Sequence, residues 1–279
     1  MGQLRLIAQS QDFIPRELVQ ELTDCQAHVT IGTWRGRATL ISEGLSDYRE
    51  RMKRYMGASV DFACLPSAPQ KPNLFMADMD STIITTECID EIADAMGIRE
   101  QISKITESTM RGELDFEDSL RARTKLLRGA HIDNLDDIWR NRIAFQEGIH
   151  ETVSTLKQQD VYCIIVSGGF TYFSEKVAHH VGFHEHRANI LEIQNGHLTG
   201  EVEEPILGRE AKAETLAELT ASKVQDGWRV CIGDGANDLA MLAAADLGIA
   251  YKAKPLVEQE APARICHTDH TSTLFFLGL

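Results

Sequence analysis

The sequence predicts an α/β protein in which a parallel sheet, covered by helices on both faces, follows a small α+β unit. Three apolar runs of strand length, at residues 74–77, 161–166 and 230–232, end in small or acidic residues and continue into helical sequence. Runs of this kind are typical of parallel strands that are buried on both faces. Their carboxyl ends meet at one edge of the sheet, where open α/β sheets bind ligands.

Length and composition are those of an ordinary globular protein of about two domains. The chain has 279 residues, of which 43% are hydrophobic and 25% are charged. No apolar stretch approaches the roughly 20 residues of a membrane span, and the N-terminus lacks a basic segment followed by an apolar one. We therefore expect a cytoplasmic protein.

Charge and cysteine content argue against several classes of partner. The formal charge of −14 disfavours nucleic acid and anionic membranes. The six cysteines are scattered without a Cys-x-x-Cys spacing, which predicts buried thiols rather than disulfides or a zinc site. The same negative charge means that any site for an anion has to supply its own cations.

Residues 1–70 are expected to form the α+β unit. Strand, helix, hairpin, helix and strand follow one another at 4–8, 14–24, 28–33 with 38–42, 46–56 and 60–65. This order, βαββαβ, predicts a ferredoxin-like layer of helices on an antiparallel sheet. Ser67–Pro72, with two prolines, is the expected linker. Structural cover, dimer formation and ligand sensing all stay open for this unit, and we favour the first two.

The remaining domain, residues 71–279, is interrupted by an insertion. Helical periodicity without strand signals covers 87–96, 99–110, 116–127 and 133–144, so that residues at about 88–146 would form a small helical cap over the strand ends. A cap excludes water from a reaction site. Further along the chain we expect helices at 171–181, 209–224 and 236–245, a hairpin at 189–202, and short strands at 247–250 and 264–266.

Two carboxylates one residue apart, Asp78 and Asp80, follow the first core strand. Acids crowded at a sheet edge repel each other and lose hydration, so a metal cation or a shared proton is needed there. Asp-x-Asp alone is equally compatible with a simple acidic turn. The segments after the other two strands, Ser167-Gly168-Gly169 and Gly233-Asp234-Gly235-Ala236-Asn237-Asp238, make coincidence a poor explanation.

These motifs, together with Lys212, resemble the ordered motifs of the haloacid dehalogenase superfamily of phosphohydrolases. The resemblance implies a Rossmann-like core and hydrolysis through an aspartyl phosphate on Asp78. Asp80 would protonate the leaving oxygen and then take a proton from water; ordering a metal is its alternative role. Mg²⁺ is the implied cofactor, held by Asp78, the backbone carbonyl of Asp80 and Asp234. Asp238 would be a direct ligand or, as the resemblance favours, a support behind the ligands.

A phosphate group would lie between the Ser-Gly-Gly turn and two further residues. Ser167 and the backbone amides of Gly168 and Gly169 suit an anion at a helix start. Lys212 offers a compact cation to phosphoryl oxygens, although a lone helical lysine is ordinarily a solvated one. Asn237 resembles the asparagine of the superfamily that touches the substrate near the phosphate.

Four residues of the cap side fall where the phosphoserine phosphatases of this superfamily contact their substrate, namely Glu87, Met110, Phe116 and Arg123. Glu87 would pair with the substrate ammonium, and Arg123 would hold its carboxylate through two hydrogen bonds. Met110 and Phe116 would form an apolar lid. Taken singly, each has a structural explanation, such as a helix-start acid for Glu87 or a surface ion pair with a nearby glutamate for Arg123.

The resemblance implies Mg²⁺-dependent hydrolysis of a small molecule, O-phospho-L-serine, to L-serine and phosphate, the last step of L-serine biosynthesis. The alternative is a phosphatase or phosphotransferase for another small ester, such as phosphohomoserine or phosphothreonine. A phosphate-accepting signalling module is disfavoured by the cap and by Asp80. No histidine is assigned to catalysis. Residues 1–70 resemble, in element order, the ACT-like regulatory domains that precede some of these enzymes, and a homodimer is one of their expected uses.

Overall fold

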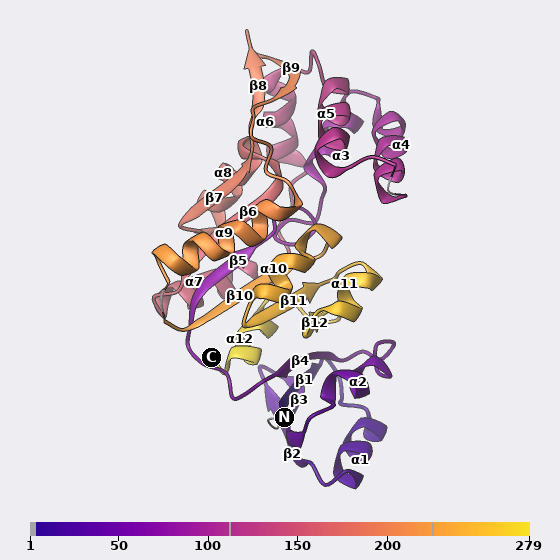
Figure 1. The fold of residues 1–279 in the computed structure, drawn as a ribbon, viewed down its shortest axis with the longest axis vertical. Helices are drawn as coiled ribbons and strands as arrows, with labels where there is room; N and C mark the ends of the chain where they lie inside the picture. Colours follow the sequence, from indigo (N-terminus) through magenta and orange to yellow (C-terminus); the bar gives the residue numbers. More distant parts are fainter. Residues whose placement is uncertain (1–3, 112, 225) are drawn as a thin grey trace.

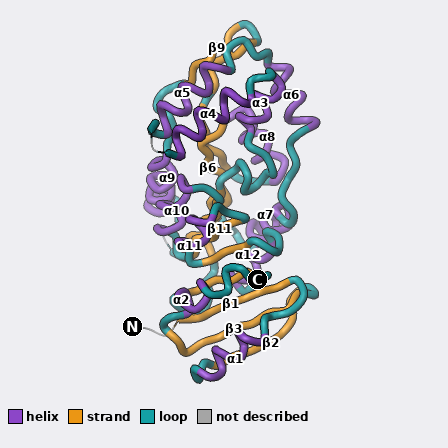
Figure 2. The backbone as a smooth tube through the Cα atoms, turned by 90° about the vertical axis from the view of Figure 1, so that its right-hand side faces the viewer, coloured by secondary structure: helices purple, strands orange, loops and turns teal. Residues whose placement is uncertain are grey.

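The computed structural model describes residues 4–111, 113–224 and 226–279. The molecule is elongated, with the N-terminal unit at one end, the cap at the other and the parallel sheet between them (Figure 1). Figure 2 shows the same three parts from the side. Within the described part of the chain, no helix has both the length and the apolar character that a membrane crossing requires.

The centre of the molecule is a parallel sheet. Its strands lie in the spatial order β11 (Leu247–Tyr251), β10 (Trp228–Gly233), β5 (Pro72–Ala77), β6 (Tyr162–Phe170) and β7 (Glu185–Asn189). A sixth strand, β12 (Ala263–Ile265), runs parallel to β11. The three strands predicted to carry the site, β5, β6 and β10, are therefore neighbours, and the predicted α/β fold is confirmed.

Helices cover both faces of this sheet. Successive side chains of β5 point in opposite directions, so its apolar residues lie on both faces and each face has to be covered. Leu74 and Met76 join a buried cluster with helices α9 (Arg209–Ser222), α10 (Leu239–Ala244) and α11 (Pro255–Glu260). Phe75 and Ala77 join a second cluster with α7 (Ile149–Gln158), α8 (Thr171–Val181) and α12 (Thr271–Leu277). With both faces buried, the strand has its polar side chains only where it ends.

The N-terminal unit has the predicted order of elements. These are β1 (Leu4–Ser10), α1 (Arg16–Asp24), β2 (His28–Trp34), β3 (Arg37–Leu45), α2 (Tyr48–Lys53) and β4 (Asp61–Leu65). The strands pair antiparallel in the order β2-β3-β1-β4, and α1 and α2 pack on one face around their own buried cluster. The predicted second helix is shorter than expected, since it begins at Tyr48 rather than at Ser46.

The sequence did not indicate how this unit meets the core. Strand β4 pairs antiparallel with β12, so the two sheets form one continuous sheet of ten strands. The face of the N-terminal sheet that α1 and α2 leave free carries Ile7, Ala63 and Leu65, which belong to the core cluster. The predicted boundary near residue 70 stays a prediction, but residues 1–70 share a sheet and a core with the rest of the chain.

The cap contains four helices, α3 (Cys88–Ala95), α4 (Arg99–Met110), α5 (Phe116–Leu126) and α6 (Ile132–Asn141). The hairpin formed by β8 (Leu191–Gln194) and β9 (His197–Val202), which turns at the predicted Asn195-Gly196, packs beside α5 at the same end of the molecule (Figure 1). Backbone hydrogen bonds join Gly129 to Leu198 and Ile132 to Gly196. The inserted cap is thus confirmed, and a hairpin from the core domain extends it.

Candidate active site

The carboxylate of Asp78 and the ammonium of Lys212 form the centre of the site. Asp78 follows the last residue of β5, and its backbone N–H donates to Ile232 O at 3.0 Å, which fixes it to β10. Lys212 Nζ, on α9, lies 2.8 Å from Asp78 Oδ2 and 2.6 Å from Asp238 Oδ1. Burial by itself lowers the pKa of Lys212, but the Asp238 and Asp78 carboxylates hold this pKa above its ordinary value. Lys212 is therefore a buried cation and not a solvated surface lysine.

The loop after β10 brings two more carboxylates to the same place. One oxygen each of Asp78, Asp234 and Asp238 lies within 4.8 Å of the others. Both oxygens of Asp238 are occupied, Oδ1 by Lys212 and Oδ2 by the backbone N–H of Gly235 at 2.9 Å. The Asp234 carboxylate accepts only one hydrogen bond from the described residues, from the Thr82 hydroxyl at 3.2 Å.

Two glycines make this loop possible. A methyl group on Gly233 would lie 2.4 Å from the Asp238 carboxylate, and one on Gly235 would lie 2.2 Å from Asn237 Oδ1. A side chain at position 233 would therefore displace Asp238, and one at position 235 would force the Asn237 amide to move. The glycines therefore let Asn237 and Asp238 fold back over the strand end and place them beside Asp234.

The Asp80 side chain lies beside the cluster, next to Gly169 and Cys88. Its Oδ2 accepts a 3.3 Å hydrogen bond from the backbone N–H of Cys88, whereas its Oδ1 is buried without a partner among the described residues. Burial, followed by the charge of Glu87, raises the pKa of Asp80 well above its ordinary value. The raised pKa suits Asp80 to act as a proton donor, and its side chain lies outside the three-carboxylate cluster.

The Ser-Gly-Gly segment lies at the end of β6 rather than in a turn after it, because β6 continues to Phe170. Ser167 Oγ is buried and accepts the Gly169 N–H at 3.0 Å. A methyl group on Gly169 would lie 3.1 Å from Asp80 Oδ2, and one on Gly168 would lie 2.9 Å from Cζ of Phe116. The glycines therefore allow close approach from two sides, by the catalytic loop and by the cap.

Phe116 is the first residue of α5, and its ring faces two glycines of the core. A methyl group on Gly168 would lie 2.9 Å from Cζ of the ring, and one on Gly208, the residue before α9, would lie 3.8 Å from its Cδ1. The cap is thus closed over the strand ends. Met110, the other predicted lid residue, ends α4, and its side chain lies outside the described residues.

Glu87 and Arg123 face the site from the cap side. Glu87 precedes α3, and its Oε1 accepts the Ser81 hydroxyl at 2.7 Å. Burial in the crevice and the charge of Asp78 raise the pKa of Glu87, even though the residue keeps solvent contact.

The pKa of Arg123 is shifted in the opposite direction to that of Glu87. Its Nε donates to Ser119 O at 3.2 Å, and it makes no ion pair within the described ranges. Its two candidate surface partners are engaged elsewhere, since Glu113 pairs with Arg111 and Glu117 with Arg121. Burial lowers the pKa of Arg123, which the charge of Glu87 only partly offsets. A half-buried guanidinium without a carboxylate is suited to bind one from a ligand.

The donor set fits a hard divalent cation. Asp78 and Asp234 present carboxylate oxygens at one point, and burial, together with the charges of Asp78 and Asp238, raises the pKa of Asp234 to about 7. Carboxylates crowded in this way repel one another, and a cation that prefers oxygen ligands relieves the repulsion. The residues present therefore fit a divalent metal site.

Comparison with known proteins agrees with this geometry. Residues 75–243, more than half of the chain, match the family model of the haloacid dehalogenase-like hydrolases. The chain belongs to this family. A phosphoserine phosphatase of Haemophilus influenzae is 41% identical over 222 residues, which cover 78% of this chain and 70% of the relative.

Two solved structures have folds similar to that of this hydrolase. A haloacid dehalogenase family hydrolase of Salmonella enterica serovar Typhi aligns with a TM-score of 0.86 at 27% identity, over 98% of both chains. A phospho-aspartyl intermediate analogue of phosphoserine phosphatase aligns with a TM-score of 0.67 at 37% identity, over 74% of this chain and 99% of the other. The resemblance inferred from the motifs is confirmed, and about a quarter of this hydrolase has no counterpart in the second structure.

The hydrolase site contains two residues that the sequence motifs left without a role. Thr82 belongs to the Asp-Met-Asp-Ser-Thr motif, but only the structure shows its hydroxyl on Asp234. His270 is fully buried, and its Nε2 lies 2.8 Å from Thr82 O. Nothing in the spacing of the histidines indicates this contact, because the two residues are 188 positions apart.

Proposed function

We propose that this chain is a Mg²⁺-dependent phosphoserine phosphatase that hydrolyses O-phospho-L-serine to L-serine and phosphate. The observation that carries the proposal is the half-buried Arg123, which lacks a carboxylate partner within the described residues and lies on the cap side of a phosphatase centre. A substrate with both a phosphate and an α-carboxylate would satisfy Lys212 at one end and Arg123 at the other. The curated relative named phosphoserine phosphatase supports the same substrate.

In the first step, a carboxylate oxygen of Asp78 attacks phosphorus and the bond from phosphorus to the serine oxygen breaks. Asp80 gives its proton to the departing serine oxygen, and the raised pKa of Asp80 favours the protonated form that this step needs. Lys212, already 2.8 Å from Asp78, stabilises the negative charge on the phosphoryl oxygens. The product of this step is an aspartyl phosphate on Asp78.

In the second step, Asp80 is a carboxylate and takes a proton from a water molecule. The water oxygen attacks phosphorus, the bond from phosphorus to Asp78 breaks, and the Asp78 carboxylate is restored. Ser167, the amides of Gly168 and Gly169, and Asn237 would hold the phosphate oxygens during both steps. The contact of Phe116 with Gly168 keeps bulk water away until serine has left.

We propose Mg²⁺ as the cation, held by Asp78, Asp234 and the backbone carbonyl of Asp80, where it would offset the negative charge of the phosphoryl group. Asp238 accepts hydrogen bonds from Lys212 and from the Gly235 N–H, and the family resemblance favours a supporting role for it. We therefore assign it to orienting Lys212 and the loop instead of to the metal itself.

Specificity would come from the cap. Glu87 would bind the substrate ammonium and Arg123 the carboxylate, while Met110 and Phe116 would form the apolar lid. The alternative is a phosphatase or phosphotransferase for phosphohomoserine or phosphothreonine, which present the same groups at different spacings. We place the reaction in the cytoplasm as the last step of L-serine biosynthesis, and a homodimer and an ACT-like role for residues 1–70 stay predictions.

The decisive experiment is phosphate release in the presence of Mg²⁺ from L-phosphoserine, D-phosphoserine, phosphothreonine, phosphohomoserine and p-nitrophenyl phosphate. We expect the highest kcat/KM for L-phosphoserine. If p-nitrophenyl phosphate is cleaved but phosphoserine is not preferred, the roles of Glu87 and Arg123 are wrong while the hydrolytic centre stands. No cleavage of any ester would contradict the proposal as a whole.

A further inference from the structure

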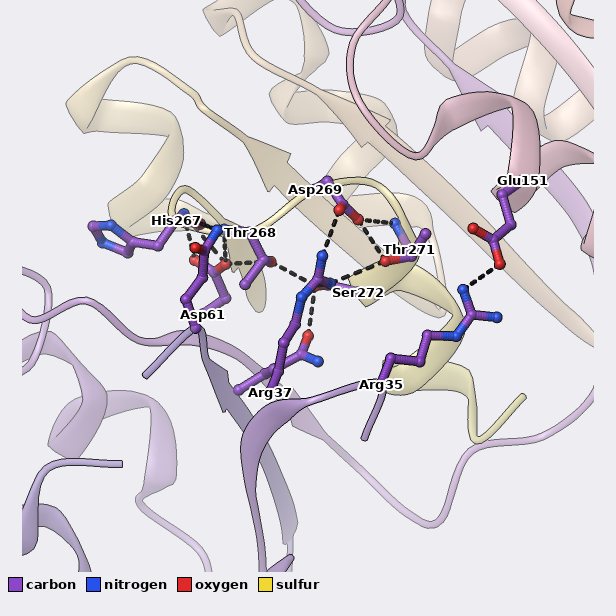
Figure 3. A network of polar contacts seen from close by, with 11 residues as sticks. Arg35, Arg37, Asp61, Glu151, His267, Thr268, Asp269, Thr271 and Ser272 are labelled. Carbon is purple, nitrogen blue, oxygen red and sulfur yellow. Dashed lines mark hydrogen bonds and ion pairs between the residues drawn. The ribbon is translucent and has the colours of Figure 1, made fainter. Parts of the chain in front are cut away.

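The segment 266–272, which connects β12 to α12, lies between the N-terminal unit and the catalytic loop. Figure 3 shows the polar network between this segment and the N-terminal unit, in which Arg37 and Asp61 point toward Thr268, Asp269 and Ser272. On its other side the segment continues to His270, which contacts the loop that follows Asp78. Segment 266–272 is therefore held at two ends by parts of the chain that are far apart in sequence.

Asp61, the first residue of β4, is the strongest anchor of the segment. It is fully buried, and its two carboxylate oxygens accept the backbone N–H groups of Cys266, His267 and Thr268 at 2.7–3.2 Å. Its Oδ2 also accepts the Thr268 hydroxyl at 2.6 Å. Bonds from several N–H groups to one buried carboxylate are strong and directional, so Asp61 fixes the backbone of the segment.

Arg37, from β3, holds the second half of the segment. Its guanidinium forms an ion pair with Asp269 and donates to the Thr271 hydroxyl at 2.9 Å (Figure 3). The Ser272 hydroxyl lies 2.5 Å from Gln9 Oε1 on β1. Three strands of the N-terminal unit thus contribute side chains to the position of one segment of the hydrolase core.

His270 links segment 266–272 to the active-site loop through a hydrogen bond. A carbonyl oxygen only accepts hydrogen bonds, so Nε2 of His270 carries the proton that binds Thr82 O at 2.8 Å. The ring stacks on Tyr251 at 3.9 Å between centroids, and burial lowers the pKa of His270 to about 4, which keeps the ring neutral. Nδ1 is buried without a partner within the described residues. Such a ring is confined to one orientation with one donor.

Thr82 is the last member of the chain of contacts. Its N–H and those of Ile83 and Ile84 all donate to Met79 O at 2.8–3.3 Å, which makes the loop after Asp78 a tight turn. Its hydroxyl donates to Asp234 Oδ1 at 3.2 Å. A rotation of Thr82 would therefore move the hydrogen bond that orients Asp234.

We propose that His270 is a positioning residue of the metal site and that residues 1–70 act through it, by fixing segment 266–272, to keep Asp234 and the catalytic loop in place. The consequence of this inference for catalysis rests on the proposed function. Its test does not, because metal binding can be measured without a substrate. Groups behind metal ligands change metal affinity by roughly 10- to 100-fold when they are removed. Because His270 acts through Thr82, we expect the lower end of this range.

Two substitutions separate the hydrogen bond from the packing of the ring. His270→Phe keeps an aromatic ring on Tyr251 but removes the donor to Thr82 O. His270→Gln restores an N–H donor and removes the ring. His267→Phe is the matched control, because His267 lies on the same segment with an exposed side chain and makes its hydrogen bonds through its backbone N–H and carbonyl. Mg²⁺ binding to each metal-free protein is measured by calorimetry, and hydrogen exchange of the Ile83 amide reports on the loop.

We expect His270→Phe to weaken Mg²⁺ binding by about tenfold and to speed exchange at Ile83, while His270→Gln and His267→Phe stay within about threefold of the parent. Unchanged Mg²⁺ binding in His270→Phe would overturn the proposal. Equal losses in the Phe and Gln variants would also overturn it, since the ring and not the hydrogen bond would then be responsible.

The role of the N-terminal unit is tested by Asp61→Asn. This substitution keeps the size of the side chain but weakens its hydrogen bonds with three backbone N–H groups. We expect Mg²⁺ binding to weaken by about threefold, and the double variant Asp61→Asn with His270→Phe to bind no worse than His270→Phe alone. Independent, additive losses would refute the link through His270. If phosphoserine is not the substrate, these binding results stand unchanged, so the two proposals fail separately.

Discussion

The two ends of the site differ in how far their polar groups are already satisfied. At the sheet end, Lys212 lies between Asp78 and Asp238 at 2.8 and 2.6 Å, and all three residues are buried. At the cap end, Arg123 has no acid partner within the described ranges, and Glu87 accepts a single hydroxyl. The groups that we propose for the chemistry are paired in advance, whereas the groups that we propose for recognition are left for a ligand to satisfy.

This difference has a physical reason. A carboxylate nucleophile must be held at a fixed distance from its cation before phosphate arrives, because reorganisation during the reaction adds to the barrier. A recognition group gains selectivity when it is costly to leave unpaired, since a substrate that lacks the matching charge then binds poorly. Removing a residue from the first group should stop every reaction, and removing one from the second should change only the preference.

The largest effect is expected from Asp78→Asn. The amide cannot form the aspartyl phosphate, so turnover of every ester should fall by at least about 10⁴-fold. Lys212 keeps Asp238 as a partner, so the fold should survive. Steady-state rates on phosphoserine and p-nitrophenyl phosphate, with circular dichroism for the fold, measure both expectations.

Asp160→Asn is the control for this substitution. Asp160 is exposed and lies two residues before β6, at the opposite end of that strand from Ser167, and its positive φ of 59° is a conformation that asparagine tolerates. Its rates should equal those of the parent. Substantial turnover by Asp78→Asn would show that Asp78 is not the nucleophile.

A smaller and selective effect is expected from Arg123→Ala. Loss of a buried charge pair with the substrate carboxylate costs about 2–4 kcal/mol, or roughly a hundredfold in kcat/KM for phosphoserine. The rate on p-nitrophenyl phosphate, which has no carboxylate, should change by less than about threefold. Comparing kcat/KM for the two esters measures the selectivity directly.

Arg121→Ala supplies the control on the same helix. Arg121 pairs with Glu117, Asp118 and Glu204 at the surface, and residues two positions apart on a helix point in different directions. Both esters should be cleaved at parental rates. If Arg123→Ala lowers both rates equally, the cap end contributes to every reaction as the sheet end does, and the proposed difference between the two ends is wrong.

The smallest effect concerns pH. The pKa of Asp234 is raised to about 7 in the metal-free protein, and that of Asp238 to about 6, in both cases by burial first and then by neighbouring carboxylates. Mg²⁺ requires ionised ligands, so its affinity should fall by about tenfold between pH 8 and pH 6, as one proton competes for Asp234. Calorimetric titration at a series of pH values measures this slope.

The stability of the metal-free protein should move the other way. Between the ordinary aspartate pKa and about 7, the folded state keeps a proton on Asp234 that the unfolded state has lost. This contribution therefore favours the fold at the acidic side of that window and is lost as pH rises through it. The gain in Tm on adding Mg²⁺ should be larger at pH 8 than at pH 5.5, and a gain independent of pH would contradict the assignment of Asp234.

Periodicity and motif spacing predicted most of the hydrolase core. The alternation in β5 and the helical repeats of the cap are local properties, so they were readable without the fold. Helix α7 has the same signal in Ile149, Val153 and Leu156, although it was not assigned. Helices α11 and α12 were also not predicted, because runs of six and seven residues are too short for helical periodicity to stand out.

What the sequence determined by itself was the chemistry at the strand ends, because it depends on which side chains follow each strand. Only the tertiary structure decided that Lys212 lies between Asp78 and Asp238, that β4 pairs with β12, and that His270 reaches Thr82. The physical reason is that every strand edge and every carbonyl offers the same backbone groups to any partner. Which partner is chosen depends on how the whole chain packs.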